Sequence, residues 1–249
     1  MGNIILKTPD EIKIMRKAGG ILSKILKQVA ASVADGVTTR DIDLLTESLI
    51  VQHGCRAAFK GYRGFPGSAC VSVNQEVVHG IPGNRKIKNG DIVSIDVGLI
   101  YQGYYADTAT TVTVGPVSEQ TKKLVEVTRE SLHAGIMQAR AGQHLSDISH
   151  AVQKHVEHHG FSVVRDFVGH GIGTTLHEEP EIPNYGPPHT GPILREGMVF
   201  CIEPMVNMGS WQTKIMDDGW TVETEDGTPS AHFEHMIAVT AGGPDILTE

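Results

Sequence analysis

Residues 94–111, SIDVGLIYQGYYADTATT, have the pattern of two β-strands and carry one aspartate on each of them. Alternating residues on both sides of Gly103 indicate two strands joined by a glycine-containing turn. Asp96 falls on the first strand and Asp107 on the second. The hairpin is half apolar and contains no basic residue. Both carboxylates therefore need a partner that this hairpin does not supply.

The composition predicts a globular chain. Its 249 residues are 40% hydrophobic, which is enough to bury a large core in one domain or in two tightly joined halves. No apolar run is long enough to cross a membrane, and the start, MGNIILKTPDEIKIM, lacks the basic region and apolar core of a signal peptide. Leu6 stands where a myristoylation signal at Gly2 requires Ser or Thr. We expect a cytoplasmic protein without membrane contact.

Charge and cysteine content exclude further classes of function. The net charge is -8 and there is no basic tract, which argues against nucleic-acid binding. Cys55, Cys70 and Cys201 are scattered in apolar contexts without a CxxC pair. They are expected to be reduced core thiols, and not a zinc or disulfide framework.

The chain contains an internal repeat, expected at approximately residues 8–115 and 118–242 of a single domain, 1–249. Residues 8–33 and 118–141 both begin with a helix-start signal and continue with a helical apolar period, and each is followed by a turn and a second helix. The following residues recur at one spacing: Gly36, Asp41 and Gly54 in the first half, and Gly142, Asp147 and Gly160 in the second.

The two halves also match in their acidic residues. GDIVSID, residues 90–96, aligns without a gap on GMVFCIE, residues 197–203, and DTATTVTVG, residues 107–115, aligns on EHMIAVTAG, residues 234–242. The matched residues are Asp96 with Glu203, Asp107 with Glu234, and His79 with His177. Each half is therefore expected to offer one hairpin with a carboxylate on either strand and a histidine ahead of it. Packing about a pseudo-twofold axis would bring four carboxylates together.

Four converging carboxylates predict a metal site. They cannot all be ionised in a partly buried site without a positive partner. A single acid in a strand is usually paired with Lys or Arg or faces water, but FCIEP, residues 200–204, and HFEHMIAV, residues 232–239, surround their glutamates with apolar neighbours. FVGHGIGTTLHEEP offers His170 or His177 as an imidazole ligand. Such an oxygen-rich site suits Mn, Fe, Co or Mg, and bridging carboxylates commonly hold two ions about 3.5 Å apart for hydrolysis.

The spaced acids and histidine resemble a known family. Their contexts are DVGLIYQGYYAD, GHGIG, IEP and FEH, and the chain resembles the methionine aminopeptidases of type I, of the short bacterial kind, over essentially its whole length. The resemblance implies an α+β pita-bread fold, with two pseudo-twofold-related halves and an antiparallel sheet covered by helices. It also implies removal of the initiator methionine from nascent proteins and peptides when the second residue is small, by attack of a metal-bridging hydroxide on the scissile carbonyl.

The resemblance further implies a site with two divalent ions, drawn from Co, Mn, Fe, Zn and Mg. Asp96 would chelate one ion, Asp107 and Glu234 would bridge both, and His170 with Glu203 would complete the shell of the other. The implied partners are the N-termini of nascent polypeptides at the ribosome exit, and the implied state is a monomer.

Three residues would assist the chemistry by the same resemblance. Glu203 would carry a proton from the attacking water to the leaving amine, His177 would donate to the developing oxyanion, and His79 would lie by the scissile amide and the next residue. The chain's own start, Met1-Gly2-Asn3, has a small second residue. We therefore expect the active enzyme to trim Met1 from an inactive copy of itself if that terminus is flexible.

A pocket for methionine is implied as well. Its walls would be Tyr62, Phe65, Cys70, Leu176 and Trp220. From the residues alone each is expected to be ordinary core, although YRGFPGSAC joins aromatics to glycines in a loop that suits a pocket rim. The chain departs from the family at Leu176, where an aromatic is also frequent. It departs again at His232, where glutamine is commoner.

Three alternatives were weighed against this interpretation. Prolidases and proline aminopeptidases share the fold and ligand pattern but usually carry a large N-terminal domain, for which there is no room before the helix at Thr8. A binding module that has lost catalysis would not need all five ligand positions filled. His155 and His159 in HVEHHG have metal-capable spacing, but they lack the HExxH order and match IVQHG in the repeat, so a solvated helix face is expected.

Overall fold

The structure is a computed structural model that describes residues 3–249. Met1 and Gly2, on which the trimming and lipidation expectations fall, lie outside the described residues. No helix within residues 3–249 has the length and hydropathy needed to cross a membrane.

Four long helices form where the sequence predicts them. They are α1 (Pro9–Ser32), α2 (Thr39–Gln52), α3 (Glu119–Ile136) and α4 (Leu145–His158). Capping boxes set the start of α1 and α2. The side chains of Thr8 and Thr38 each accept a hydrogen bond from the backbone N–H of the acidic residue three positions later. The carboxylate of that acidic residue accepts a hydrogen bond from the backbone N–H of the threonine. The helix prediction is confirmed for both halves of the chain.

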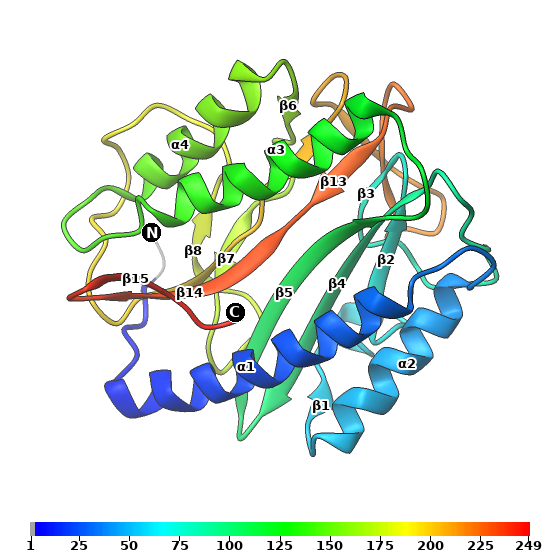
Figure 1. The fold of residues 1–249 in the computed structure, drawn as a ribbon. Helices are drawn as coiled ribbons and strands as arrows, with labels where there is room; N and C mark the ends of the chain where they lie inside the picture. Colours follow the sequence, from blue (N-terminus) through cyan, green and yellow to red (C-terminus); the bar gives the residue numbers. More distant parts are fainter. Residues whose placement is uncertain (1–2) are drawn as a thin grey trace.

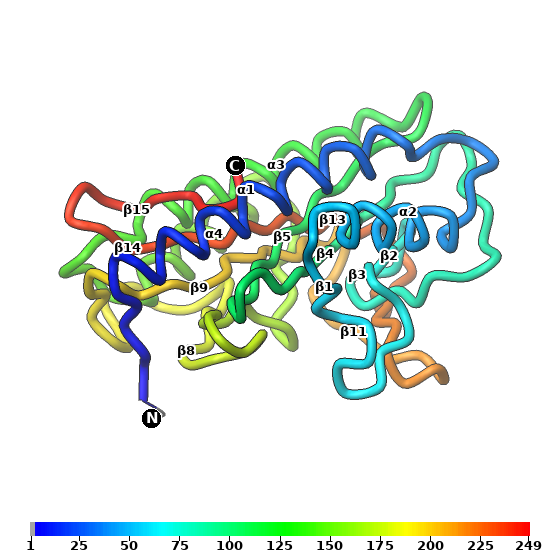
Figure 2. Tube along the Cα trace, turned by 90° about the horizontal axis from the view of Figure 1, so that it is seen from below, coloured from blue at the N-terminus to red at the C-terminus, as the bar shows by residue number. Residues whose placement is uncertain are grey.

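A nine-stranded antiparallel sheet forms the centre of the molecule, in the order β1-β4-β5-β14-β9-β7-β8, with β2 beside β4 and β15 beside β14. Its strands are β1 (Arg56–Ala57), β2 (Ala69–Val73), β4 (Ile92–Tyr101), β5 (Tyr104–Thr113), β7 (Gly169–Gly171), β8 (Glu178–Ile182), β9 (Val199–Ile202), β14 (Glu234–Thr240) and β15 (Gly243–Ile246). Figures 1 and 2 show α1 and α3 side by side over one face of this sheet. Figure 2 shows the loops around β8 and β11 on the opposite side.

Two three-stranded sheets flank the main sheet. One has the order β13-β10-β6 and the other β11-β12-β3. Their strands are β13 (Ser230–His232), β10 (Met205–Asn207), β6 (Ser162–Val163), β11 (Thr213–Ile215), β12 (Val222–Thr224) and β3 (Glu76–Val78), and one 3-10 helix, η1 (Tyr62–Gly64), precedes β2.

The first predicted hairpin is confirmed, and the second is wrong in its connection. β4 and β5 are joined by a two-residue turn at Gln102 and Gly103. β9 and β14 also pair antiparallel, with Cys201 opposite Met236, but residues 203–233 separate them and contain β10 to β13. Pro204 explains the difference, because proline has no N–H to donate to the ladder. Glu203 therefore lies just beyond its strand.

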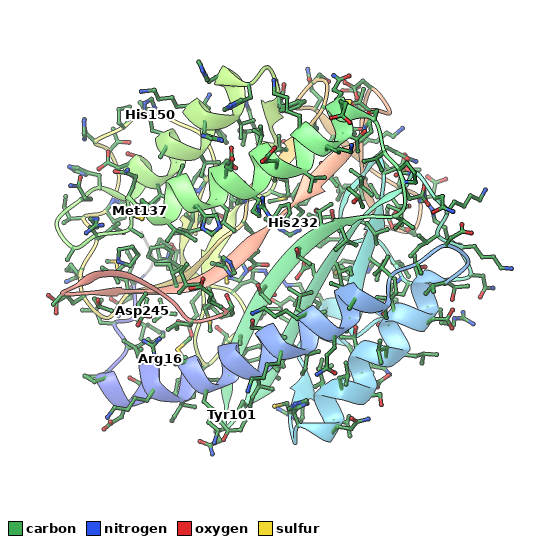
Figure 3. All side chains as sticks on the ribbon, viewed as in Figure 1. Arg16, Tyr101, Met137, His150, His232 and Asp245 are labelled. Carbon is green, nitrogen blue, oxygen red and sulfur yellow. The ribbon has the colours of Figure 1, made fainter. Side chains whose placement is uncertain are left out.

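Helix α1 packs on the main sheet and contacts β15, the last strand of the chain. Its buried face, which includes Met15, Leu22 and Ile25, belongs to the main hydrophobic core together with Val97 and Leu99 of β4. Fully burying one such side chain contributes about 1.5–3 kcal/mol. Arg16 of α1 also forms an ion pair with Asp245 of β15, and Figure 3 labels both residues.

Two adjacent glycines in α1 provide a matched test of this packing. A Cβ on Gly19 would clash with the Leu247 carbonyl oxygen, whereas a Cβ on Gly20 would have nothing within 4 Å. Gly19→Ala should lower the free energy of unfolding by about 1–3 kcal/mol through overpacking. Gly20→Ala should raise it by about 0.5–1 kcal/mol, because alanine is the better helix former. Urea denaturation of both variants measures the difference, and equal shifts would contradict this packing.

Candidate metal centre

Three neighbouring strands place three carboxylates on one face of the sheet. Asp96 of β4 lies opposite Ala109 of β5, and Glu234 at the start of β14 lies opposite the same Ala109 on the other side. Asp107 precedes Ala109 by two residues and so points to the same face. The small side chain of Ala109 leaves the space between these acids open. One oxygen of each of the three carboxylates lies within 4.8 Å of the others.

An imidazole and a fourth carboxylate complete this group. Nε2 of His170 lies 3.5 Å from Oε1 of Glu203 and 3.9 Å from Oδ2 of Asp107. Nδ1 of His170 donates to the Gly171 carbonyl oxygen at 3.0 Å, so the lone pair of the neutral ring is on Nε2 and faces the acids. The structure therefore brings together all five side chains predicted as ligands, with His170 rather than His177 beside the carboxylates.

The charges of these acids are not balanced by the chain. Within residues 3–249, histidine is the only basic residue with a nitrogen within 4.0 Å of any of the four carboxylates. Burial raises the pKa of Asp96 to about 7. Burial and the neighbouring carboxylates raise the pKa of Asp107, Glu203 and Glu234 well above the ordinary range.

The donor atoms suit a divalent cation. Oδ1 of Asp96, Oδ1 of Asp107 and Oε1 of Glu234 are buried and have no hydrogen-bond partner among the described residues. Buried oxygens without a donor are rare in native proteins, and hard divalent cations prefer oxygen ligands of this kind. The residues present therefore fit a divalent metal ion.

A cavity of about 180 Å³ opens beside the carboxylates. Its lining includes the five predicted pocket residues Tyr62, Phe65, Cys70, Leu176 and Trp220. Phe65, Cys70 and Leu176 are buried, and the rings of Phe65 and Trp220 meet edge to face with centroids 5.2 Å apart. The cavity is thus apolar at one end and acidic at the other.

The two predicted catalytic histidines also line this cavity. The ring of His177 stacks on Tyr62, and its Nδ1 lies 2.9 Å from the Tyr62 hydroxyl. The ring of His79 meets Phe167 and Trp220 edge to face. Burial lowers the pKa of His79 to about 4 and also lowers the pKa of His177, so both rings are neutral near pH 7.

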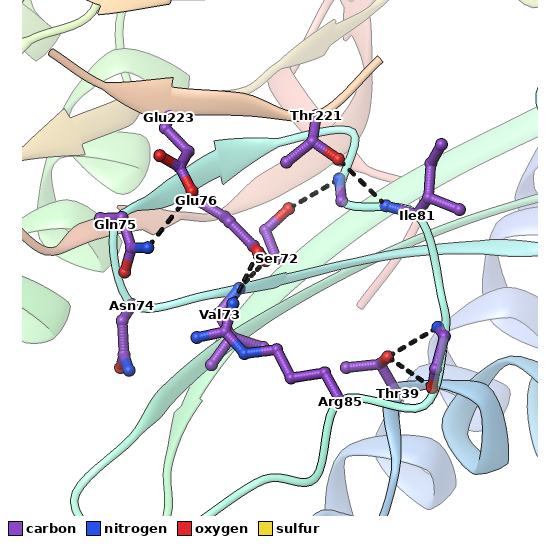
Figure 4. Close-up of polar contacts among 12 residues, drawn as sticks. Thr39, Ser72, Val73, Asn74, Gln75, Glu76, Ile81, Arg85, Thr221 and Glu223 are labelled. Carbon is purple, nitrogen blue, oxygen red and sulfur yellow. Dashed lines mark hydrogen bonds and ion pairs between the residues drawn. The ribbon is translucent and has the colours of Figure 1, made fainter. Parts of the chain in front are cut away.

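A hydrogen-bond network holds His79 in an unusual backbone conformation. Its φ of 59° lies in the left-handed region. The next residue, Gly80, donates its N–H to Oγ of Ser72 at 3.1 Å (Figure 4), and its carbonyl accepts from the N–H of Val71 at 2.9 Å. A Cβ at Gly80 would clash with the Val71 carbonyl oxygen, so this approach requires glycine.

The same network joins His79 to the Trp220 loop. The N–H of Ile81 points at Oγ1 of Thr221 at 3.5 Å (Figure 4), and Asp218 accepts from the Thr221 hydroxyl and from the N–H of Trp220. This network has no signal in the sequence, because its members are far apart along the chain.

Two further residues at the centre were not predicted there. Sγ of Cys201, Nε2 or Nδ1 of His170 and an oxygen of Glu234 lie within 4.8 Å of one another, although Cys201 is free and buried as expected. Strand alternation provides no signal for Cys201, because Glu203 lies beyond the end of β9. His232 was noted only as a departure from the family, yet its Nε2 is 3.9 Å from Oε2 of Glu203.

The other histidine pair belongs to a helix end. The rings of His155 and His159 are 4.7 Å apart, and Nε2 of His155 lies 3.2 Å from a Glu130 carboxylate oxygen. Both histidines are half-buried, so the expected solvated face is only partly open to water.

Comparisons with known proteins agree with the fold. The profile of metallopeptidase family M24 matches residues 13–241. The methionine aminopeptidase 1 of Bacillus subtilis is 54% identical over 98% of this chain and 99% of its own length. The crystal structure of the methionine aminopeptidase from Rickettsia prowazekii matches with a TM-score of 0.98 and 43% identity, over 99% of this chain and 100% of that one.

A more distant structure shares the fold but is larger. The prolidase from Pyrococcus horikoshii matches with a TM-score of 0.79 and 25% identity over 98% of this chain, but over only 63% of its own. These matches confirm the predicted α+β fold of the pita-bread kind, with a curled antiparallel sheet covered by helices.

Proposed function

The chain belongs to metallopeptidase family M24, and from this premise we propose that it removes the N-terminal methionine of proteins and peptides. The observation that carries the proposal is the cavity, which joins an apolar end lined by Phe65 and Trp220 to an acidic end lined by Asp96 and Glu234. The apolar end suits an unbranched apolar side chain such as methionine. The acidic end suits metal-dependent hydrolysis of the bond that follows it.

Membership of the family implies divalent metal, and we assign two ions to this centre. Asp96 would hold one ion, Asp107 and Glu234 would bridge both, and His170 with Glu203 would complete the shell of the other. The oxygen-rich donor set favours Mn, Fe, Co or Mg. When bound, such ions would lower the pKa of coordinated water to about 7 and polarise the substrate carbonyl.

His177 is suited to donate a hydrogen bond to the developing oxyanion. If the Tyr62 hydroxyl donates to Nδ1 of His177 across their 2.9 Å contact, the proton of the neutral ring is on Nε2. The stacked Tyr62 ring keeps the imidazole in this orientation. A donor fixed in advance toward the place where charge develops stabilises the transition state.

Glu203 and His79 complete the proposed roles. The Glu203 carboxylate, which is 13% exposed and whose pKa is raised, is suited to take the proton of the attacking water and return it to the leaving amine. His79, held rigidly by the Ser72 and Gly80 contacts, would lie by the scissile amide and restrict the second residue of the substrate to a small one.

We also propose the setting in which the protein acts. Its substrates are the N-termini of nascent polypeptides, met at the ribosome exit in the cytoplasm, because initiator methionines are exposed there. The active unit is a monomer with one catalytic domain, 1–249, built from repeats at approximately 8–115 and 118–242. The matched order of two helices followed by paired strands in each half supports the repeat.

The bridging carboxylates give the first test of the metal assignment. Asp107→Asn and Glu234→Gln should each abolish hydrolysis and loosen both ions, because each side chain is assigned to both. Metal content after dialysis, measured with activity, checks this expectation. Asp10→Asn, at an exposed acid of α1, is the control and should change neither quantity. Full activity in either bridging variant would overturn the two-ion assignment.

His177→Ala separates an oxyanion donor from a metal ligand. Turnover should fall by about 10²–10³-fold, the usual cost of losing one such donor, while bound metal is unchanged. Steady-state kinetics and metal analysis of the same sample measure both quantities. Loss of metal would instead make His177 a ligand.

Substrate choice tests the function itself. With Mn or Co supplied, Met-Gly-Asn-X peptides should release free methionine, whereas peptides with a bulky second residue should not. An X-Pro-Y peptide, with no methionine, is the matched probe for the prolidase alternative. Cleavage of X-Pro-Y alone would indicate a proline-specific enzyme, and cleavage of neither, with metal bound, would indicate a binding module.

A further inference from the structure

His232 lies closest to the carboxylate oxygen of Glu203 that is not the nearest one to His170. It ends β13 near the centre of the view in Figure 3 and is only 2% exposed. Its Nε2 lies 3.9 Å from Oε2 of Glu203, whereas Nε2 of His170 lies 3.5 Å from Oε1. The two oxygens of one carboxylate thus face two different imidazoles.

The backbone of His232 is fixed by three strands. Its N–H donates to Oγ1 of Thr111 on β5 at 2.9 Å, and the Thr111 hydroxyl donates back to the His232 carbonyl oxygen at 2.7 Å. Since the single hydroxyl proton of Thr111 is used there, Ser94 on β4 must donate in their 2.8 Å contact. His232 also pairs with Met205 of β10. The position from which the ring reaches Glu203 is therefore rigid.

The imidazole nitrogen that faces Glu203 lacks a partner. Nε2 of His232 is buried and forms no hydrogen bond within residues 3–249. Leaving such a group unsatisfied carries a desolvation penalty that a hydrogen bond would remove. In the described part of the chain, His170 and His232 are the only Lys, Arg or His residues with a nitrogen within 4.0 Å of the Glu203 carboxylate, and only His232 has Oε2 as its nearest oxygen. Each group is thus the natural partner of the other.

The distance between Nε2 of His232 and Oε2 of Glu203 indicates which kind of contact they can form. At 3.9 Å the atoms are too far apart for a direct hydrogen bond, which needs about 2.7–3.2 Å. They are too close for a bridging water, which would hold them about 4.5 Å apart. A movement of about 1 Å by the Glu203 side chain closes the contact.

Resting on the proposed function, we propose that His232 is a positioning residue that donates from Nε2 to Oε2 of Glu203. The contact fixes the plane of the carboxylate and keeps Oε1 turned toward His170 and the metal centre. It also leaves Glu203 in one orientation for carrying a proton. Removing a group that holds a metal-binding side chain in this way typically lowers metal affinity or activity 10–100-fold.

Three single variants test this role. His232→Leu removes the donor while filling the space, and His232→Gln keeps an amide N–H donor. His235→Leu is the matched control, because His235 is a half-buried histidine on β14, the next strand along the chain, and it does not line the cavity. Its Nδ1 lies 2.9 Å from the Thr248 hydroxyl. Calorimetric titration with Mn²⁺ alone gives metal affinity, and the visible spectrum of the Co²⁺ form reports its coordination. Release of methionine from Met-Gly-Asn-X gives kcat and KM.

The expected pattern is specific. His232→Leu should weaken Mn²⁺ binding or lower kcat by about 10–100-fold, alter the Co²⁺ spectrum and leave KM nearly unchanged. His232→Gln should restore the wild-type affinity and spectrum to within a few-fold. His235→Leu should lower the urea midpoint without changing metal affinity.

Two outcomes would overturn the proposal. One is wild-type metal affinity, spectrum and kcat in His232→Leu. The other is an equal loss in the Leu and Gln variants, which would trace the effect to packing. If the wild-type protein releases no methionine but only His232→Leu weakens Mn²⁺ binding, the positioning role stands and the proposed function fails.

Discussion

Mutual repulsion among four closely grouped carboxylates, of which those of Asp107 and Glu234 are buried, is the constraint on which the rest of this structure depends. Asp96, Asp107, Glu203 and Glu234 converge without a lysine or arginine beside them, and burial together with their neighbours raises their pKa values. A site of this kind either takes up protons or binds a cation. The chain therefore needs a scaffold stiff enough to keep the four groups together against their repulsion, and the curled sheet provides it.

The backbone around the four carboxylates and His170 is tightly packed, which keeps these side chains in place. A Cβ on Gly169 would clash with the Cys201 carbonyl oxygen, and one on Gly171 would clash with the Glu179 carbonyl oxygen. The glycines on either side of His170 thus let β7 lie close between β8 and β9. His170 is the only side chain of that short strand, and its ring is held by its own neighbour's carbonyl. Rigidity of this proposed ligand follows from the packing of the backbone.

The acids and helices were predictable because they leave periodic or repeated patterns in the sequence. Asp96 and Asp107 lie in alternating strands, and their counterparts Glu203 and Glu234 appear at matched positions in the second half. The segment inserted between β9 and β14 was not predictable in the same way, because one proline ends β9 and four further strands, β10 to β13, follow before β14. The roles of Ser72 and His232 depend on contacts between residues distant in the chain. Such contacts have no local signature.

The structural similarity to prolidases bears on which part of the protein selects the substrate. A fold shared at a TM-score of 0.79 shows that the curled sheet by itself does not select the substrate. In this chain we expect the substrate to be selected by the apolar walls of the cavity, which include Phe65, Leu176 and Trp220. Through Asp218 and Thr221, the Trp220 loop is hydrogen-bonded to the loop that carries His79. Trp220, proposed to contact the methionine side chain, and His79, proposed to lie beside the scissile bond, therefore share one support, so a change in the shape of the pocket is expected to move His79 as well.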